Sequence, residues 1–350
     1  MFPYKELCGT IHLHTKYSDG GVDYPKLQRT ALQVGLDFVV VTDHMSLGGL
    51  KDGFEGIRDN LIVIVGYEHQ DPSNLNHYLA IGVNEVFDQI TNPQDYVNAI
   101  REAGGIGFIA HPAEKRNYIG QFPPYPWTDW KVKGYDGLEI WNQMSEWVEQ
   151  LRSWYSIFKL FYPRRFLDAA PSDLLQRWDK LNLSQFIAGI GGVDAHTRKI
   201  GKGICSFEVF PLKVELKGIR THVYVPESTD LSDFAMTKKN LLNSLKNGNS
   251  YISNFRRGDA NGSQIMMALT DGSFLPPGKQ PHHSKPESIS VVLPEKANIR
   301  FLLNGNVVKT NTGKSADLKI TDKGVYRVEV YKKEKTWIYS NPFPVGSYPL

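Results

Sequence analysis

Short apolar runs recur along the N-terminal part of the chain, and a longer stretch of mixed polarity follows each one. The runs are rich in Val, Ile and Phe and are bounded by Gly, Asp or Asn. This composition is typical of strands that are buried on both faces, as in parallel sheets. We therefore predict strands at Thr10–Leu13, Phe38–Thr42, Leu61–Val65, Ile106–Ala110, Leu138–Trp141 and Phe186–Ile190.

The stretches between these runs can hold helices. Tyr24–Val34 has apolar residues at helical spacing and is followed by Gly35, and Pro93–Ala103 is followed in the same way by Gly104. Strands that alternate with helices in this manner predict an α/β fold, either an open sheet or a barrel.

The pattern changes after about Phe255. Before that point, Thr237–Lys246 predicts a further helix and Tyr251–Ser253 a strand. After it, runs of alternating polarity are separated by turn signals such as Asn304-Gly305. We predict two domains, an α/β unit at residues 1–255 and a small all-β, sandwich-like unit at residues 256–350. The alternating runs of the second unit are Ser288–Leu293, Ile299–Leu303 and Val325–Val330.

Two segments interrupt the alternation of strands and helices. Asn117–Lys133 combines several prolines with aromatic residues, and Trp147–Trp178 is dense in aromatic residues. These segments can be packing elements of an irregular cap, or some of their rings can line a substrate pocket.

Composition indicates a globular protein with a sizeable core. Of 350 residues, 41% are hydrophobic and 22% are charged, so the fold does not depend on disulfides. Cys8 and Cys205 belong to no thiolate metal pattern, and both a single long-range disulfide and a reduced compartment fit them.

Charge and hydropathy exclude several classes of partner. A net charge of +3 does not favour nucleic acid or an anionic membrane, and no apolar run approaches the roughly 20 residues that cross a bilayer. Met1–Leu7 has no apolar signal-peptide core, so we expect a cytoplasmic protein, or an exported one if a signal peptide has been removed. Nothing in the sequence indicates an oligomeric state.

Most of the predicted strands end in His, Asp or Glu. In the first strand, His12 and His14 alternate with Ile11 and Leu13, so both imidazoles are expected on one face. Functional sites assemble at the carboxyl ends of parallel strands. Histidines scattered at random along the chain would not gather at this edge so consistently. The further candidates at these ends are Asp19, His44, Glu68, His111, Asp194 and His196.

This set of donors predicts a metal centre. Imidazole nitrogen with carboxylate oxygen, and without thiolate, suits Zn²⁺, Mn²⁺ or Fe. The donors exceed what one ion takes, so we expect about two or three divalent ions, with bridging carboxylates holding neighbours roughly 3.5–4 Å apart. Such ions lower the pKa of bound water toward ~7 and neutralise the charge of a phosphate under attack.

The same residues lie in motifs that resemble a known family. HLHTKYSDG at His12–Gly20, VVTDH at Val40–His44, AHP at Ala110–Pro112 and GVDAH at Gly192–His196, with Gly66-Tyr-Glu68 between them, resemble the PHP (polymerase and histidinol phosphatase) superfamily. The resemblance covers roughly residues 8–255. It implies a distorted (β/α)7 barrel with two or three metal ions at the carboxyl ends of its strands, and a metal-dependent phosphoesterase activity.

The resemblance also implies a role for each ligand. His12, His14 and Asp194 resemble ligands of a first ion, Glu68 a bridge to a second ion, and His111 a ligand of that second ion. His77, in Asn76–Gly82, resembles a further ligand of the second ion. Asp19, His44 and His196 resemble ligands of a third ion or, where that site is empty, residues that contact the other ligands. With Arg198, these three residues are our candidates for catalysis.

For other polar residues, the sequence either leaves the role open or places them outside the predicted metal centre. Glu139, in Gly137–Asn142, resembles a recurring family segment and can act either beside the site or in the structure alone. Arg198 and Lys199 can hold a substrate phosphate or can be solvated loop charges. His69 is expected to point away from Glu68, and His222, His282 and His283 lie outside the motif pattern.

We carry three functional hypotheses. The first is hydrolysis of a phosphomonoester or phosphodiester of a small molecule by a metal-bound hydroxide. The second is metal-dependent hydrolysis of a carboxyl ester, a carbamate ester or an amide. The third is a non-catalytic metal-binding module, which the complete set of ligands disfavours.

Overall fold

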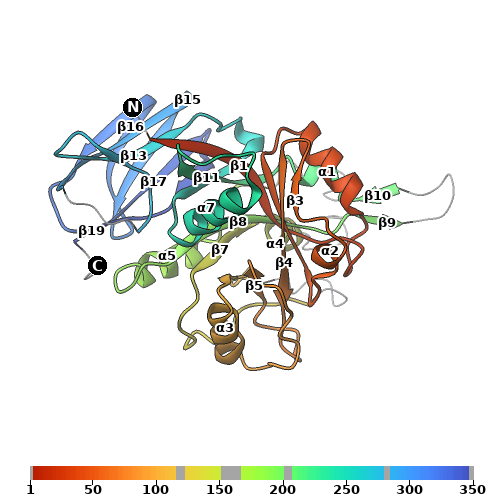
Figure 1. The fold of residues 1–350 in the computed structure, drawn as a ribbon. Helices are drawn as coiled ribbons and strands as arrows, with labels where there is room; N and C mark the ends of the chain where they lie inside the picture. Colours follow the sequence, from red (N-terminus) through yellow and green to blue (C-terminus); the bar gives the residue numbers. More distant parts are fainter. Residues whose placement is uncertain (1–2, 116–122, 151–166, 201–206, 280–283, 347–350) are drawn as a thin grey trace.

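Seven strands close a barrel in the computed structural model, which describes residues 3–115, 123–150, 167–200, 207–279 and 284–346. Hydrogen bonds run around the ring from β1 through β2, β4, β5, β6, β7 and β8, and β8 pairs again with β1. Figure 1 shows these strands near the middle of the molecule, to the right of the blue C-terminal strands. Their bounds are β1 Tyr4–Leu13, β2 Phe38–His44, β4 Leu61–His69, β5 Tyr78–Ile81, β6 Ile106–Ile109, β7 Gly137–Asn142 and β8 Ala188–Ala195.

The barrel is mixed, and the prediction of an α/β fold with a distorted (β/α)7 barrel and a sandwich-like unit is wrong. Strands β1, β2 and β4 run parallel, as do β6, β7, β8 and β1, but β5 is antiparallel to both β4 and β6. Only about 20% of the described residues are helical. Residues 70–77 between β4 and β5 are too few for a helical crossover, which takes a dozen or more residues, so these strands form a hairpin.

The helices lie between strands at irregular intervals. Asp23, Asn92 and Asp233 cap α1, α3 and α7, because each side chain accepts a hydrogen bond from a backbone N–H of the first turn. These three helices confirm the helical spacing predicted from the sequence. The described helices are α1 Tyr24–Gln33, α2 Gly48–Lys51, α3 Pro93–Glu102, α4 Gln143–Glu149, α5 Ser172–Leu181, α6 Leu212–Glu215 and α7 Phe234–Lys246. Among these helices, not one combines the length and the apolar character that crossing a bilayer requires.

The C-terminal strands continue the sheet of the barrel. Strand β11 (Ile219–Pro226) pairs with β1, β12 (Ser250–Asn254) pairs with β11, and β18 (Lys335–Ser340) pairs with β12. The C-terminal strands are therefore hydrogen-bonded to the barrel sheet through β18 rather than set apart from it. The predicted boundary after residue 255 falls within the short helix η4 (Phe255–Arg257) and stays a prediction.

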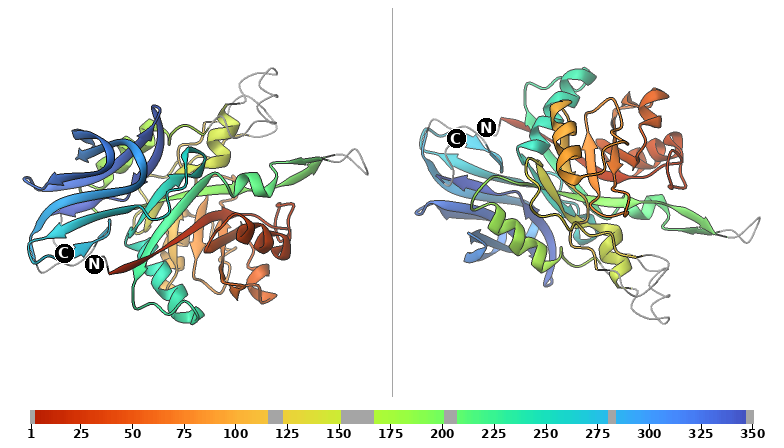
Figure 2. Two further views of the ribbon diagram at one scale, coloured as in Figure 1. Left: turned by 90° about the horizontal axis from the view of Figure 1, so that it is seen from above. Right: turned by 90° about the horizontal axis from the view of Figure 1, so that it is seen from below.

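A single long strand, β15, covers two of the predicted C-terminal runs. It pairs with β16 along its length, with β13 at one end and with β17 at the other. In Figure 2 these strands lie on the opposite side of the molecule from the small projecting sheet of β9 and β10. The remaining bounds are β3 Gly56–Arg58, β9 Arg198–Ile200, β10 Phe207–Val209, β13 Gln264–Leu269, β14 Phe274–Leu275, β15 Pro286–Leu303, β16 Asn306–Lys319, β17 Gly324–Lys332 and β19 Phe343–Val345.

The barrel strands are buried on both faces. Along β2, Phe38 and Val40 pack into one apolar cluster, whereas Val39 and Val41 pack into another. This arrangement explains why the strands appear in the sequence as continuous apolar runs instead of alternating ones. It also leaves the strand ends as the place where polar side chains converge.

Candidate metal centre

All the predicted metal ligands come together at one end of the barrel. Among the described residues, their nitrogen and oxygen atoms form four overlapping groups, and the atoms of each group lie within 4.8 Å of one another. Such proximity of buried imidazoles and carboxylates is what a multi-ion site requires. The groups are His12–Glu68–His111, His12–His14–Asp194, His44–Glu68–His77 and His14–Asp19–His44–His196.

Glu68 is at the middle of this cluster. Its Oε1 lies 2.8 Å from Nδ1 of His77 and 3.1 Å from Nε2 of His111. Its Oε2 faces the imidazoles of His12, His14 and His44, at 3.1, 3.3 and 3.3 Å. Each oxygen therefore belongs to a different set of imidazoles, as expected of a carboxylate that bridges two ions.

Asp194 is a second buried carboxylate of the cluster. Its Oδ1 lies 3.3 Å from Nε2 of His14, 3.4 Å from Nδ1 of His196 and 3.6 Å from Nε2 of His12. Strand β8 therefore brings a carboxylate to the two imidazoles that β1 supplies.

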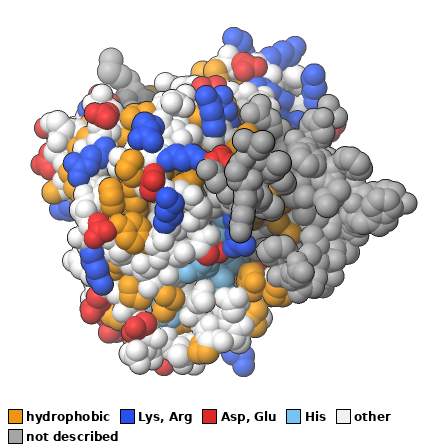
Figure 3. Space-filling model, turned by 90° about the vertical axis from the view of Figure 1, so that its right-hand side faces the viewer, with side chains coloured by type: hydrophobic (Ala, Val, Ile, Leu, Met, Phe, Trp, Pro, Cys, Tyr) orange, Lys and Arg blue, Asp and Glu red, His pale blue; other side chains and the backbone are white. Residues whose placement is uncertain are grey.

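Asp19 forms the more open side of the cluster. Its Oδ1 faces His196 at 3.3 Å and both His14 and His44 at 3.9 Å, while its Oδ2 accepts a hydrogen bond from Nη2 of Arg198 at 3.0 Å. The Asp19 side chain is 41% exposed and Arg198 is 50% exposed. Figure 3 shows histidine atoms reaching the surface on one face of the molecule, with acidic and basic side chains beside them.

The backbone is unusual at three of the predicted ligands. His12, His111 and Asp194 have φ values of +67°, +27° and +52°. The pairing of β1 with both β2 and β8 shifts register between Ile11 and Leu13. The imidazoles of His12 and His14 thus converge, with ring centroids 5.1 Å apart, through a bulge instead of the regular alternation we expected. Non-glycine residues in this conformation are concentrated at functional sites.

The predicted residues are supported by polar groups that sequence reasoning missed. Asp43 accepts hydrogen bonds from Thr15 N, Thr15 Oγ1 and Ser18 Oγ, each at 2.7 Å, and so holds the loop that carries Asp19. Asn142 donates to Glu139 at 2.9 Å and approaches Asp194 at 3.4 Å. Both residues lie inside segments that the sequence analysis quotes, Asp43 in Val40–His44 and Asn142 in Gly137–Asn142, and this position was the signal that could have indicated them.

Burial and opposite charge perturb the titration of the cluster in the absence of a cation. Burial alone would lower the pKa of His14 and of His111, but neighbouring carboxylates raise both to about 9. Burial would also raise the pKa of Glu68 and of Asp194, yet the surrounding imidazoles hold both well below the usual range. The imidazoles of the cluster therefore keep the carboxylates of Glu68 and Asp194 ionised.

The donor set fits divalent cations. Within the described residues, no Lys or Arg forms an ion pair with the buried carboxylates Glu68, Glu139 and Asp194, so imidazoles are their only ionic partners. Among the described residues neither ring nitrogen of His14 has a hydrogen-bond partner, although His14 is only 1% exposed. A buried imidazole without a hydrogen bond, aimed at two carboxylates, is suited to an ion.

Several other residues lie away from the centre. His69 makes a hydrogen bond to the carbonyl of Ile90 and packs against Tyr96. These contacts agree with the predicted orientation of His69 away from Glu68. His222 is buried beside Glu6 and Ser253. The described residues do not include the remaining predicted positions, which are His282, His283, Cys205, the side chain of Lys199 and parts of both aromatic segments.

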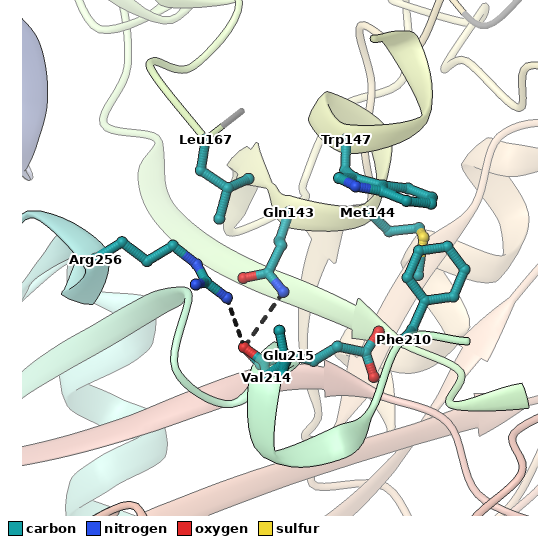
Figure 4. A pocket seen from close by; sticks show the side chains of 8 residues that line it. All are labelled: Gln143, Met144, Trp147, Leu167, Phe210, Val214, Glu215 and Arg256. Atoms are coloured by element: carbon teal, nitrogen blue, oxygen red, sulfur yellow. Dashed lines mark hydrogen bonds between the residues drawn. The ribbon is translucent and has the colours of Figure 1, made fainter. Parts of the chain in front are cut away.

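A separate pocket lies behind the centre, and none of the predicted ligands lines it. Figure 4 shows Glu215 of α6 at one wall of this pocket, with Met144 and Trp147 of α4 opposite. Oε2 of Glu215 accepts a hydrogen bond from the hydroxyl of Thr197 at 2.9 Å, next to the ligand His196. Glu215 therefore links the wall of this pocket to the turn that follows β8.

No family model matches the chain. A segment of 114 residues is 25% identical to an uncharacterized protein of Methanocaldococcus jannaschii, and it covers 29% of this chain and 66% of that protein, which is less than two thirds of its length. A two-domain protein of Bacteroides vulgatus that contains a predicted PHP-like metal-dependent phosphoesterase is 13% identical, with a TM-score of 0.48 over 97% of this chain and 96% of that one.

A proposed metal-dependent phosphoesterase of Bifidobacterium adolescentis is also similar. It is 15% identical, with a TM-score of 0.34 over 59% of this chain and 93% of that one. The order of the HxH, DH, AHP and DxH motifs in the sequence resembles that of the PHP superfamily. In the structure the residues of these motifs lie together in one cluster.

Proposed function

We propose that this protein is a metal-dependent hydrolase that cleaves a phosphomonoester or phosphodiester of a small molecule. The observation that supports the proposal is the position of Glu68, whose two oxygens face separate sets of imidazoles from several strands. A carboxylate so placed can join two ions about 3.5–4 Å apart, which is the spacing of two-metal phosphoester hydrolases.

We assign the ligands to ions as the motif resemblance implies. His12, His14 and Asp194 would hold a first ion, and His77 and His111 a second, with Glu68 between them. Asp19, His44 and His196 would hold a third. These donors suit Zn²⁺, Mn²⁺ or Fe, and in such sites the bound ions supply Lewis acidity and lower the pKa of a water ligand toward ~7.

The chain itself provides orientation and phosphate contacts. His12 and His14 are fully buried, so their ring positions are set by packing before substrate arrives. Arg198 is half-exposed at the open side of the cluster and uses Nη2 to bind Asp19. A guanidinium has five N–H donors, so its remaining donors can bind phosphate oxygens beside the ions.

The test uses the full chain and two kinds of measurement. Metal content is determined by elemental analysis after loading with Zn²⁺ or Mn²⁺, and cleavage is measured with p-nitrophenyl phosphate, bis-p-nitrophenyl phosphate, p-nitrophenyl acetate and a p-nitroanilide. We expect two or three ions per chain and p-nitrophenol release from at least one phosphoester. Asp194→Asn should lose metal and turnover, while His69→Gln, at a buried histidine that faces away from the cluster, should keep both.

The outcomes separate the hypotheses. Bound metal with cleavage of only the carboxyl ester or the anilide would replace the phosphoester assignment by ester or amide hydrolysis. Bound metal without turnover of any substrate would favour a binding module. A wild-type chain that takes up no metal under any loading condition would overturn the proposal.

A further inference from the structure

Strand β7 lies between β6 and β8, yet it supplies none of the predicted ligands. Its neighbours carry His111, just after β6, and Asp194, within β8. What β7 places among them is Glu139, whose side chain is buried and whose residue is 1% exposed. A carboxylate so deeply buried needs specific partners, because an unpaired charge is strongly destabilised away from water.

Both oxygens of Glu139 contact the cluster. Oε1 lies 3.0 Å from Nδ1 of His12, and Oε2 accepts the backbone N–H of His111 at 2.8 Å. Oε2 also accepts Nδ2 of Asn142 at 2.9 Å, and the same amide group approaches Oδ2 of Asp194 at 3.4 Å. Glu139 thereby touches two predicted ligands directly and a third through one side chain.

We infer that Glu139 is a positioning residue that sets the ring orientation of His12 and the backbone of His111 for metal binding. The inference rests on the proposed metal centre. A hydrogen bond from Nδ1–H of His12 to Oε1 fixes the tautomer whose free lone pair is on Nε2. That nitrogen faces Oε2 of Glu68 at 3.1 Å and Oδ1 of Asp194 at 3.6 Å.

The contact to His111 acts on the backbone. His111 has a φ of +27°, outside the regions that most residues adopt, and its N–H is held by Oε2 of Glu139. In this conformation its Nε2 reaches Oε1 of Glu68 at 3.1 Å. Without the acceptor, the peptide can relax and move the imidazole away from Glu68.

The neighbouring strand β8 leaves room for the Glu139 carboxylate because it has a glycine, Gly192, at this point. A Cβ at Gly192 of β8 would lie 1.9 Å from Oε1 of Glu139 and 3.0 Å from Cβ of His12. The first distance is too short for a real contact and the second is very tight, so Gly192→Ala should displace Glu139, His12 or both. This substitution perturbs the contact while every carboxylate of the centre remains in the chain.

The expected loss follows from the groups that contain the affected ligands. Removal of an outer hydrogen-bond partner of a metal ligand typically weakens metal affinity by about 10–100-fold. His12 occurs in two of the four groups and His111 in one of them, whereas the group around Asp19 contains neither. We therefore expect Glu139 variants to weaken the ions at the groups that contain His12 and His111, and to affect the ion at Asp19 less.

The experiment measures metal affinity by competition with a chromophoric Zn²⁺ chelator, in the wild type and in Glu139→Gln, Glu139→Ala and Gly192→Ala. The control is Glu146→Gln. Glu146 also accepts hydrogen bonds within the structure, from Trp141 Nε1 and Asp168 N, each at 2.6 Å, but it belongs to no candidate metal group. Thermal melts of the metal-free proteins report any loss of fold.

Affinity about 10-fold weaker in Glu139→Gln and about 100-fold weaker in Glu139→Ala is expected, with the control unchanged. In the Zn²⁺-loaded proteins, ¹⁵N NMR of the imidazoles should show His12 as the Nδ1–H tautomer in wild type and as a mixture in Glu139→Ala. Wild-type affinity in both Glu139 variants would overturn the inference while leaving the proposed function intact. A wild type that binds no Zn²⁺ would overturn the proposed function itself.

Discussion

Replacement of Glu68 by Gln is the most informative single change, because it keeps the size of the side chain and removes its charge. Glu68 faces imidazoles with both oxygens and belongs to two of the four candidate groups. The variant should therefore lose most of the stabilisation that metal ions give to the folded protein. Its metal-free form should still fold, because the barrel strands and their apolar clusters are untouched.

The size of the effect can be worked out from binding linkage. An ion present at 100 times its dissociation constant stabilises the folded state by about 2.7 kcal/mol, so two lost ions correspond to roughly 5 kcal/mol. In a chain of 350 residues, 1 kcal/mol shifts the melting temperature by about 2 °C. Metal should thus raise the wild-type melting temperature by about 10 °C more than that of Glu68→Gln.

The assay is differential scanning calorimetry of each protein with a chelator and with Zn²⁺ or Mn²⁺. Taking the difference within each protein removes any effect of the substitution on the metal-free fold. Glu55→Gln is the matched control, because Glu55 also contacts β4, through a hydrogen bond from Val65 N at 2.9 Å, but belongs to no candidate group. A full metal-induced shift and full metal content in Glu68→Gln would refute the bridging role.

Three further predictions concern the same centre. In denaturant titrations the metal-free protein should lose stability as pH rises from about 6.5 to about 9. The folded-state pKa of His14 and of His111 is about 9, so protonation of these imidazoles stabilises the folded protein below the unfolded pKa and no longer does so above the folded pKa. Bound metal should abolish this loss of stability with pH, and a loss that persists with metal bound would contradict the assignment of His14 and His111 as ligands. In Gly21→Ala the new Cβ would lie 1.9 Å from the carbonyl oxygen of Thr197, the residue after His196, and should displace His196. Elemental analysis should then show the loss of one metal equivalent of three, and an unchanged stoichiometry would count against the third ion. Arg198→Gln should raise KM for a phosphoester about 10-fold with metal content unchanged, and an unaltered KM would remove it from phosphate binding.

Local sequence determined the elements and the chemistry of the centre. The apolar runs at Phe38–Thr42 and Leu61–Val65 became β2 and β4, and the helical spacing after Asp23 became α1, because periodicity and caps act over a few residues. The ligands could be chosen for a similar reason. His, Asp and Glu side chains can bind metals wherever the fold places them, and the structure brings all the predicted ligands together.

Tertiary structure decided the direction of the strands and the support of the ligands. Tyr78–Ile81 is too short and apolar to show its direction, and only pairing with both β4 and β6 makes it the antiparallel strand of the barrel. The C-terminal strands join the barrel sheet through hydrogen bonds between β12 and β18, which are far apart in the chain. Glu139 acts on His12 across 127 positions of sequence. Pairing partners and buried contacts of this kind depend on which surfaces meet after folding, and no local pattern contains that information.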